Sequence, residues 1–453
     1  MAGGRAGASG AGETQPPPDE PARALAAGLE AARVRVVALT WTDNAGIVRA
    51  KAVPVARLEA AARFGVGMSP CFDVYTSADL MTASEHLGGP DGDLRLFPDL
   101  GRLVPLAAQP GWAWAPVDRY DQTGRPHPGC QRRFARTMQE RAAAQGIGLR
   151  MGFETEWVVA TPGLEPPSTG PAYGMTRIVE LSDYLRDIAA ALAAQHIEVL
   201  QIHPEYTAGQ FEVSTAPAAG PVGAADDVVL VRETVRAVTA RHGWRASFAP
   251  RFTAGTVGNG SHLHFSLDGM HRDPRGRYGL APEAESFLAG VLDRLPALTA
   301  VANPSPASAL RLVPSHWAGA YRCWGVENRE AALRLVPGDP ADPDGGHAEY
   351  KCADAAANPY LLAGSVIAAG LAGVAEGARL PEPVAGDPAG RPGAERLPSG
   401  LGEAADHFAG AEFLKEAMGE VLHGAFLAVR RAEDAAAEGR TAEEITDDTR
   451  WRY

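Results

Sequence analysis

Acidic and histidine side chains recur in four short, apolar-flanked segments of this 453-residue chain, and no other feature limits its fold as strongly. The segments are GFETEWVV with Glu154 and Glu156, HPEYTAGQFEV with Glu205 and Glu212, GSHLHFSL with His262 and His264, and HAEYK with Glu349. Five carboxylates and a histidine cannot be buried together unless cations neutralise them, because an unpaired buried charge is prohibitively costly. We therefore predict that the chain folds around a metal site.

Composition narrows the class of protein. A chain of this length with 45% hydrophobic residues is expected to bury a large core and to divide into two domains. The formal net charge of -13 argues against nucleic acid as a partner, because nucleic-acid binding needs clustered Lys and Arg. The four cysteines form no CxxC pair, which is typical of reduced thiols in a cytoplasmic protein.

Two stretches of biased composition need an explanation. Residues 1–22 are rich in Gly, Ala and Pro and lack the apolar run of a secretory signal, so they are predicted to form a disordered tail. The apolar stretch 360–375 is shorter than the roughly 20 residues that span a bilayer. It follows Asn358 and Pro359, which favour a helix start, and we predict a buried core helix and no membrane partner.

The segment pattern indicates an α+β fold. Residues 33–54 form two β-rich runs around Asp43-Asn44-Ala45-Gly46, a hairpin signal that opens a small β-rich domain predicted at 23–120. The larger domain, 121–453, is expected to combine short strands with helices. The helices are predicted at 130–145, 181–195, 223–242, 282–302, 359–376 and 411–438, and a Pro- and Gly-rich loop at 381–399.

Strand periodicity brings the acidic and histidine side chains together. Glu154 and Glu156 are two residues apart and share one strand face, as do His262 and His264. Glu205 and Glu212 have an odd separation, so Gly209 is expected to supply a bulge or turn that brings both to one side. Carboxylates with one imidazole suit Mg²⁺ or Mn²⁺ rather than Zn²⁺.

Three arginines complete the pattern. Arg311, Arg329 and Arg334 lie in the apolar-patterned segments LRLVP and WGVENREAALRLVP. Guanidinium groups beside an acid-bound metal neutralise the oxygens of a transferring phosphoryl group, which predicts an ATP site. The chain has no Walker sequence and no Gly-rich kinase loop, so this is neither a P-loop nor a protein-kinase nucleotide site.

These phrases, in this order, resemble the glutamine synthetase superfamily. The resemblance rests on GFETEW, EYTAGQFE, GNGSHLHFSL, NPSPASALRLVP, ENREAALR and ANPYL, and it runs from about Val34 to the C-terminal helix. It implies a small N-terminal β-grasp-like domain and a large catalytic domain with a curved antiparallel sheet and flanking helices. It also implies two metal ions per site and a double-ring homo-oligomer, a dodecamer, with active sites between subunits.

The resemblance assigns roles to residues of this chain. It implies a first metal held by Glu156, Glu205 and Glu212, and a second held by Glu154, His262 and Glu349. His264 and Ser266 would lie near ATP, Arg329 and Arg334 would bind its phosphates, and Arg311 would hold the substrate glutamate. The implied reaction transfers the γ-phosphoryl group of ATP to the glutamate γ-carboxylate, and an amine then displaces phosphate.

The chain departs from ammonia-using members where ammonium would bind. Trp317 stands at the position of a glutamate on the flap, and GVGMSPCFD contains no D-G-S-S phrase. Losing both acids removes the electrostatic preference for ammonia, and tryptophan offers a cation–π wall for an alkylammonium chain. Asp73 is a weak candidate for the missing base. Lys351 and His347 replace arginines, and Val257 replaces an asparagine beside Gly258, whose backbone groups remain for glutamate.

The favoured hypothesis is an ATP-dependent γ-glutamyl ligase that acts on an organic amine: ethanolamine, another monoamine or a polyamine. The neutral neighbours of Trp317, which are Ser315, Ala318 and Gly319, favour a small, singly charged amine. One alternative is an ammonia-using glutamine synthetase, which an acidic flap would have favoured. Another is a non-catalytic relative that serves as a structural or regulatory oligomer.

Overall fold

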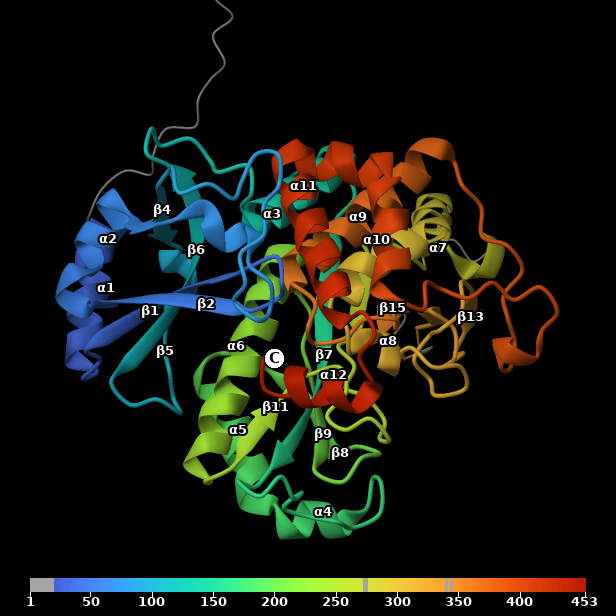
Figure 1. Ribbon diagram of the computed structural model, residues 1–453, viewed down its shortest axis with the longest axis horizontal. Helices are drawn as coiled ribbons and strands as arrows, with labels where there is room; N and C mark the ends of the chain where they lie inside the picture. The colour runs from blue at the N-terminus through green and yellow to red at the C-terminus, as the bar shows by residue number, and fades with distance from the viewer. Residues whose placement is uncertain (1–19, 272–275, 339–340, 343–344) are drawn as a thin grey trace, which may run out of the picture.

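Two β-sheets with surrounding helices make up the computed structural model, which describes residues 20–271, 276–338, 341–342 and 345–453 (Figure 1). This confirms the α+β prediction. Residues 1–19 of the predicted tail lie outside the described residues, and helix α1 (Glu20–Ala31), which was not predicted, begins inside the predicted tail. Residues 20–22 are thus helical and not part of a tail. Pro21 is tolerated in a first helical turn, and the following Ala- and Leu-rich segment favours helix.

The N-terminal sheet has the strand order β2-β1-β6-β4-β3, with β5 paired to β6. Its strands β1 and β6 are parallel, and the other pairs are antiparallel. Helices α1 and α2 (Leu58–Phe64) accompany it on the left in Figure 1. The strands are β1 (Val36–Thr42), β2 (Val48–Pro54), β3 (Val66–Met68), β4 (Leu94–Pro98), β5 (Val104–Pro105) and β6 (Trp112–Asp121).

The predicted hairpin joins β1 to β2. Oδ1 of Asp43 accepts hydrogen bonds from the backbone N–H groups of Ala45 and Ile47, both at 2.9 Å. Gly46 has φ 82°, and a Cβ there would lie 1.8 Å from the carbonyl oxygen of Ala356. Glycine is therefore required, because the turn packs directly against the catalytic domain.

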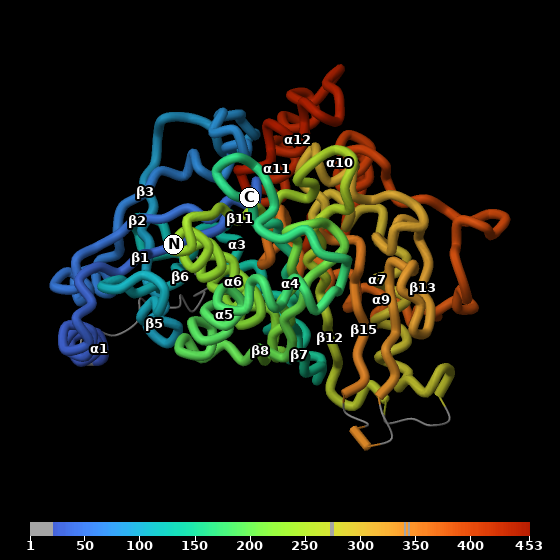
Figure 2. The backbone as a smooth tube through the Cα atoms, turned by 90° about the horizontal axis from the view of Figure 1, so that it is seen from below, coloured from blue at the N-terminus to red at the C-terminus, as the bar shows by residue number. Residues whose placement is uncertain are grey.

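The catalytic domain contains a sheet in the order β13-β14-β15-β12-β7-β9-β8, with β10 and β11 also paired to β7. Figure 2 shows β8, β7, β12 and β15 following one another across this domain. The sheet is antiparallel, as predicted, except that β13 and β14 are parallel. Its strands are β7 (Leu149–Ala160), β8 (Val199–Pro204), β9 (Gln210–Thr215), β10 (Ala218–Ala219), β11 (Arg245–Ser247), β12 (Leu263–Leu267), β13 (Trp324–Val326), β14 (Leu333–Val336) and β15 (His347–Tyr350).

The helices of this domain match the predicted segments to within a few residues. Helix α6 packs on β7, α5 packs on β8 and α6, and α7 packs on α9. The long helices are α3 (Gln131–Ala144), α5 (Ser182–Ala194), α6 (Pro221–Arg241), α7 (Pro282–Ala302), α9 (Pro359–Glu376) and α11 (Glu412–Ala437). Four shorter helices were not predicted: α4 (Met175–Glu180), α8 (Ser308–Arg311), α10 (Leu401–Ala409) and α12 (Ala442–Thr449).

Helix α9 is the apolar segment that raised the question of a membrane. Within the described ranges it is the one helix long and apolar enough to cross a bilayer, yet 72% of it is buried inside the protein. It packs against α3, α6, α7 and α11. The side chain of Asn358 caps its start by accepting from the backbone N–H groups of Tyr360 and Leu361. The prediction of a core helix is confirmed.

Candidate functional site

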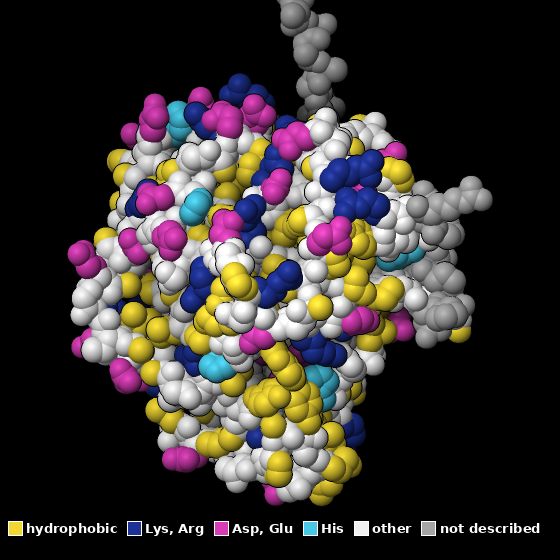
Figure 3. All heavy atoms as spheres, turned by 90° about the vertical axis from the view of Figure 1, so that its right-hand side faces the viewer, with side chains coloured by type: hydrophobic (Ala, Val, Ile, Leu, Met, Phe, Trp, Pro, Cys, Tyr) yellow, Lys and Arg dark blue, Asp and Glu magenta, His cyan; other side chains and the backbone are white. Residues whose placement is uncertain are grey.

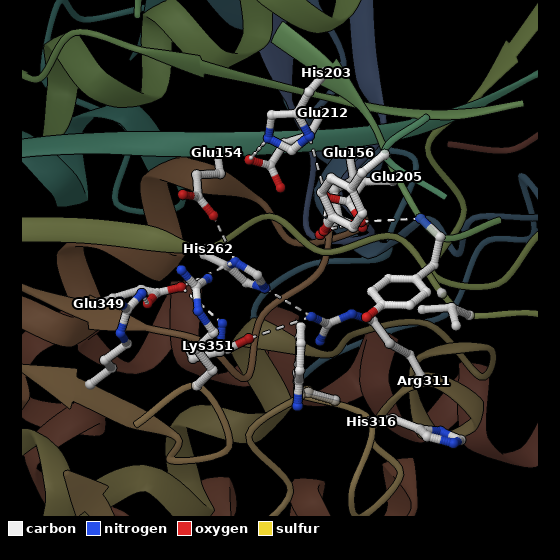
Figure 4. Close-up of a pocket in the computed structure, with 18 of the residues that line it drawn as sticks. Glu154, Glu156, His203, Glu205, Glu212, His262, Arg311, His316, Glu349 and Lys351 are labelled. Carbon is white, nitrogen blue, oxygen red and sulfur yellow. Dashed lines mark hydrogen bonds and ion pairs between the residues drawn. The ribbon is translucent and has the colours of Figure 1, made fainter. Parts of the chain in front are cut away.

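One cavity of about 660 Å³ lies at the catalytic sheet and collects most of the candidate residues (Figure 4). It is lined by all six predicted metal ligands: Glu154, Glu156, Glu205, Glu212, His262 and Glu349. The same cavity is lined by Gly258, Arg311, Trp317, Arg329, Arg334 and Lys351. His264 and Ser266 line a second cavity of about 590 Å³, which shares Glu154, Gln201 and His347 with the first. The structure thus brings the residues predicted to bind metal, nucleotide and glutamate to one of two adjoining cavities.

Strand register explains how residues distant in sequence meet. On β7 and β9, Glu156 lies opposite Glu212. On β12 and β15, His264 lies opposite Glu349, and on β14 and β15, Arg334 also lies opposite Glu349. Directly opposed residues in an antiparallel pair have side chains on the same face of the sheet, so pairing alone places these charges together.

Glu205 reaches the same side through the turn that the sequence predicted. It follows β8, and its backbone N–H donates to the carbonyl oxygen of Gln210 at 2.8 Å. Gly209 has φ 75°, and a Cβ there would lie 2.6 Å from the carbonyl oxygen of Val159. The turn, rather than a straight strand, therefore resolves the odd separation of Glu205 and Glu212.

The first candidate metal group contains Glu156, Glu205 and Glu212, each no more than 8% exposed. Burial and the neighbouring Glu212 carboxylate raise the pKa of Glu156 to about 7. Burial likewise raises the pKa of Glu205. Like charges held this close favour a divalent cation, and an all-carboxylate set fits Mg²⁺ or Mn²⁺. The residues therefore fit the metal that the sequence implied.

His203 belongs to this group and was missed by the sequence reasoning. Its Nδ1 lies 3.5 Å from Oε1 of Glu205, and its Nε2 lies 3.3 Å from Oε1 of Glu212. Contact with Glu212 raises the pKa of His203 to about 9. Ligand atoms of His203, Glu205 and Glu212 all lie within 4.8 Å of one another. The phrase HPE, with a histidine two residues before a candidate ligand, was the available signal.

The second candidate group contains Glu154, His262, His264 and Glu349. Nδ1 of His262 lies 2.8 Å from Oε2 of Glu154 and 3.3 Å from Oε1 of Glu349. Nε2 of His264 lies 3.1 Å from Oε1 of Glu154. Ligand atoms of Glu154, His264 and Glu349 lie within 4.8 Å of one another, so His264 joins the residues that could hold a cation. Burial and Lys351 lower the pKa of His262, but Glu154 and Glu349 outweigh them and raise it to about 9.

Basic side chains surround the carboxylates. Nη2 of Arg311 lies 3.1 Å from Nε2 of His262, and Nζ of Lys351 donates to Oε1 of Glu349 at 3.0 Å. Nη1 of Arg334 donates to Oε2 of Glu349 at 3.1 Å. A Cβ on Gly258 would lie 2.8 Å from Cγ of Arg311, so a small residue there sets where the guanidinium lies. These cations balance part of the acidic charge and leave donors for anionic substrates.

Asp73 is not part of this cavity. Its side chain is fully buried in the N-terminal domain, 2.7 Å from Nη1 of Arg119 and 3.0 Å from Nε2 of His127. Burial raises its pKa, but Arg119 and His127 outweigh burial and hold the pKa below its usual value. Within this chain Asp73 forms a buried ion pair outside the cavity. Its role as the missing base stays a prediction, because the resemblance places the active sites between subunits.

Comparison with known proteins agrees with this geometry. Residues 23–123 match the glutamine synthetase N-terminal domain, and residues 128–448 match the glutamine synthetase catalytic domain. The chain is 52% identical to the gamma-glutamylpolyamine synthetase GlnA3 of Streptomyces coelicolor, over 96% of this chain and 97% of that protein.

Solved structures extend the likeness to the whole fold. A novel glutamine synthase homolog matches with a TM-score of 0.84 and 34% identity, over 93% of this chain and 99% of that one. A GmaS/ADP complex matches with a TM-score of 0.81 and 27% identity, over 94% of this chain and 99% of that one. The family models together span almost the whole described chain. The chain belongs to the glutamine synthetase family.

Proposed function

We propose that this chain is an ATP-dependent ligase that joins the γ-carboxylate of glutamate to an amino group of a polyamine. The observation that carries the proposal is Trp317, which is 50% exposed and lines the cavity that contains the candidate metal ligands. A tryptophan at the acceptor position disfavours ammonium and contacts an alkyl chain. The Streptomyces coelicolor relative, a gamma-glutamylpolyamine synthetase, supports the same substrate class.

The choice of a polyamine revises the expectation of a small, singly charged amine. That expectation rested on the neutral sequence neighbours of Trp317. In the folded chain, the groove beside Trp317 is also lined by Glu327, Glu330 and Asp387. Acidic groups that are distant in sequence therefore lie next to the tryptophan, and they favour a substrate with more than one positive charge.

The residues divide the chemistry between the two cavities. We place the nucleotide beside His264 and Ser266, with its phosphates directed toward Arg329 and Arg334. Arg311, Gly258 and Lys351 would hold glutamate, and Arg311 is kept in place by its contact with His262. Bound metal ions would supply charge neutralisation for phosphoryl transfer. The amine nitrogen then bonds to the carbonyl carbon of the activated γ-carboxyl group, the C–O bond to phosphate breaks, and the nitrogen releases its proton to solvent.

The proposal is tested by phosphate release from ATP with Mg²⁺, glutamate and one amine at a time: ammonium, ethanolamine, propylamine, putrescine or spermidine. Mass spectrometry of the product identifies the γ-glutamyl amide. Putrescine or spermidine should give the highest kcat/KM. Preference for ammonium would favour the glutamine synthetase alternative, and no turnover with any amine would favour the non-catalytic one.

We also propose the cytoplasm as the location and a ring homo-oligomer, a dodecamer, as the assembly. Large apolar side chains of the N-terminal domain are exposed in the single chain, at 61% for Phe64, 64% for Leu80 and 56% for Met81. Such exposure favours self-association. Light scattering on the purified protein gives the subunit number, and a monomer would contradict this assembly.

A further inference from the structure

We infer that Tyr206 and Trp317 form an aromatic pair that supports the carbon chain of the acceptor amine and selects its length. This rests on the proposed function and adds a specificity residue, Tyr206, to it. The two rings lie 6.0 Å apart between centroids and are nearly perpendicular, at 84°. Both line the cavity that contains the candidate metal ligands.

The exposure of these rings calls for a partner. Tyr206 is 47% exposed and Trp317 is 50% exposed. On the face shown in Figure 3, hydrophobic side chains gather low on the molecule, beside histidine side chains. A ligand that covers large apolar rings at the mouth of a charged cavity removes their surface from water, which favours its binding. A flexible methylene chain with an ammonium group matches both the ring faces and the nearby carboxylates.

The turn that carries Tyr206 is held rigid. The guanidinium of Arg177, which is 3% exposed, donates to the carbonyl oxygens of Glu205 at 2.6 Å, Thr207 at 2.9 Å and Tyr206 at 3.4 Å. Tyr173 packs edge-on against Tyr206 at 5.6 Å and donates its hydroxyl to Glu205. Tyr206 is thus fixed directly beside a carboxylate at the cavity floor.

The loop that carries Trp317 is held in a similar way. The carboxylate of Glu330 accepts hydrogen bonds from the backbone N–H of Ser315 at 2.9 Å and of Trp317 at 2.7 Å. Ser315 and Trp317 have φ values of 59° and 55°, in the left-handed region that such residues rarely adopt. A loop held in that conformation keeps the indole at the mouth of the cavity, and preorganised contacts lose less entropy on binding.

Charge identifies the occupant as a polycation. The reacting amino group would enter the cavity, and the methylene chain would run along the surface of the ring pair, whose edge-to-face contact leaves no gap between the rings. Beyond Trp317, the adjoining groove is lined by Glu327, Glu330, Asp387 and one cation, Arg329. The excess of acidic groups favours a second ammonium there. A linear diamine or polyamine fits this order of reacting amine, carbon chain and second charge.

The test is steady-state kinetics of the full-length enzyme with ammonium, 1,3-diaminopropane, putrescine, cadaverine and spermidine. Tyr206→Ala and Trp317→Ala should each raise the KM of the best polyamine roughly tenfold, the loss expected for one aromatic contact with a partly desolvated cation. The KM values of glutamate and ATP should stay within about twofold. Tyr206→Phe and Trp317→Phe are the conservative variants. Each keeps a ring, so the amine KM should rise less than in the alanine variant at the same position.

Each result has a distinct meaning. Unchanged amine KM values in both alanine variants, or equal losses in the phenylalanine and alanine variants, would overturn the role of the aromatic pair. The proposed function would still stand if the wild type uses a polyamine. A wild type that uses only ammonium would overturn the proposed function itself. Thermal stabilisation by ATP and Mg²⁺ is the control that shows that each variant is folded. Both rings are half exposed, so their replacement should cost little stability.

Discussion

Two carboxylates at the floor of the cavity lie on paired strands, whereas the aromatic rings at its rim lie on two turns. Glu156 and Glu212 face each other across β7 and β9 and are 8% and 6% exposed. Tyr206 and Trp317 are about half exposed. Their positions depend on a hydrogen bond that Arg177 donates to the Tyr206 carbonyl oxygen and one that Glu330 accepts from the Trp317 N–H. The floor is fixed by the sheet, and the rim by a few local contacts.

This difference separates two parts of the function. Strand pairing tolerates little change, so the floor suits the steps of the reaction that do not depend on which amine is used. Turns on a rigid scaffold change more easily, so the rim suits the choice of amine. If the comparison is right, substitutions at the floor should stop the reaction with every amine, and substitutions at the rim should change only which amine is used.

The largest effect is expected for Glu156→Gln and Glu212→Gln. Each variant removes a charged ligand at the first candidate metal group, and kcat/KM should fall roughly a thousandfold for all amines, because metal neutralisation contributes several kcal/mol to phosphoryl transfer. Phosphate release measures it. Glu233→Gln, which disrupts an ion pair with Arg236 on α6, is the control and should keep full activity. A floor variant that lost only polyamine activity would break the comparison.

Metal removal should give the next largest effect. Mg²⁺ at about 100 times its Kd should stabilise the folded wild type by about 2.7 kcal/mol, because it binds only the folded state. Glu156→Gln should bind Mg²⁺ more weakly, yet be more stable than the wild type in EDTA, because it removes one of three crowded carboxylates. Thermal denaturation with and without Mg²⁺ measures both. Equal stability of the two proteins in EDTA would show that the carboxylates do not repel one another appreciably.

The floor was also the part that sequence could predict. Period-two spacing put Glu154 and Glu156 on one face, and Gly209 marked the turn before Glu212, since both signals are local. His203 was missed because one histidine near one carboxylate is a weak signal until β8 and β9 are paired. Its contacts with Glu205 and Glu212 exist only in the folded sheet.

The rim could be predicted only in part. Resemblance singled out Trp317, but its neighbours in sequence suggested neutral surroundings. Glu330 and Asp387 reach the loop from 13 and 72 positions away, through hydrogen bonds that no periodicity encodes. Tyr206 was passed over because it lies between two predicted metal-site residues and carries no pattern of its own. Contacts between turns are set by tertiary packing, which one sequence does not reveal.

Trp317→Glu should change the choice of amine. Placing a carboxylate at the rim adds an attractive charge for ammonium and removes the ring that contacts the carbon chain. We expect kcat/KM for ammonium to rise and that for polyamines to fall, each roughly tenfold. Competition between ammonium and putrescine in one reaction, with products separated by mass spectrometry, measures the ratio. Trp317→Gln is the control for size without charge. An unchanged ratio would mean that the amine is selected elsewhere than at the rim.

Glu330→Gln should have the smallest effect and shows how the rim is held. The glutamate uses one oxygen for the N–H of Ser315 and the other for the N–H of Trp317, whereas glutamine has only one acceptor oxygen. One N–H therefore loses its partner, and the left-handed loop becomes less favourable. The polyamine KM should rise about threefold, less than after removal of the indole, while the glutamate KM stays constant.

Loss of the Glu330 charge alone would also weaken polyamine binding, but added salt screens that contribution. A KM difference between variant and wild type that persists at high ionic strength would therefore identify positioning of Trp317 as the role of Glu330, and one that vanishes would identify its charge.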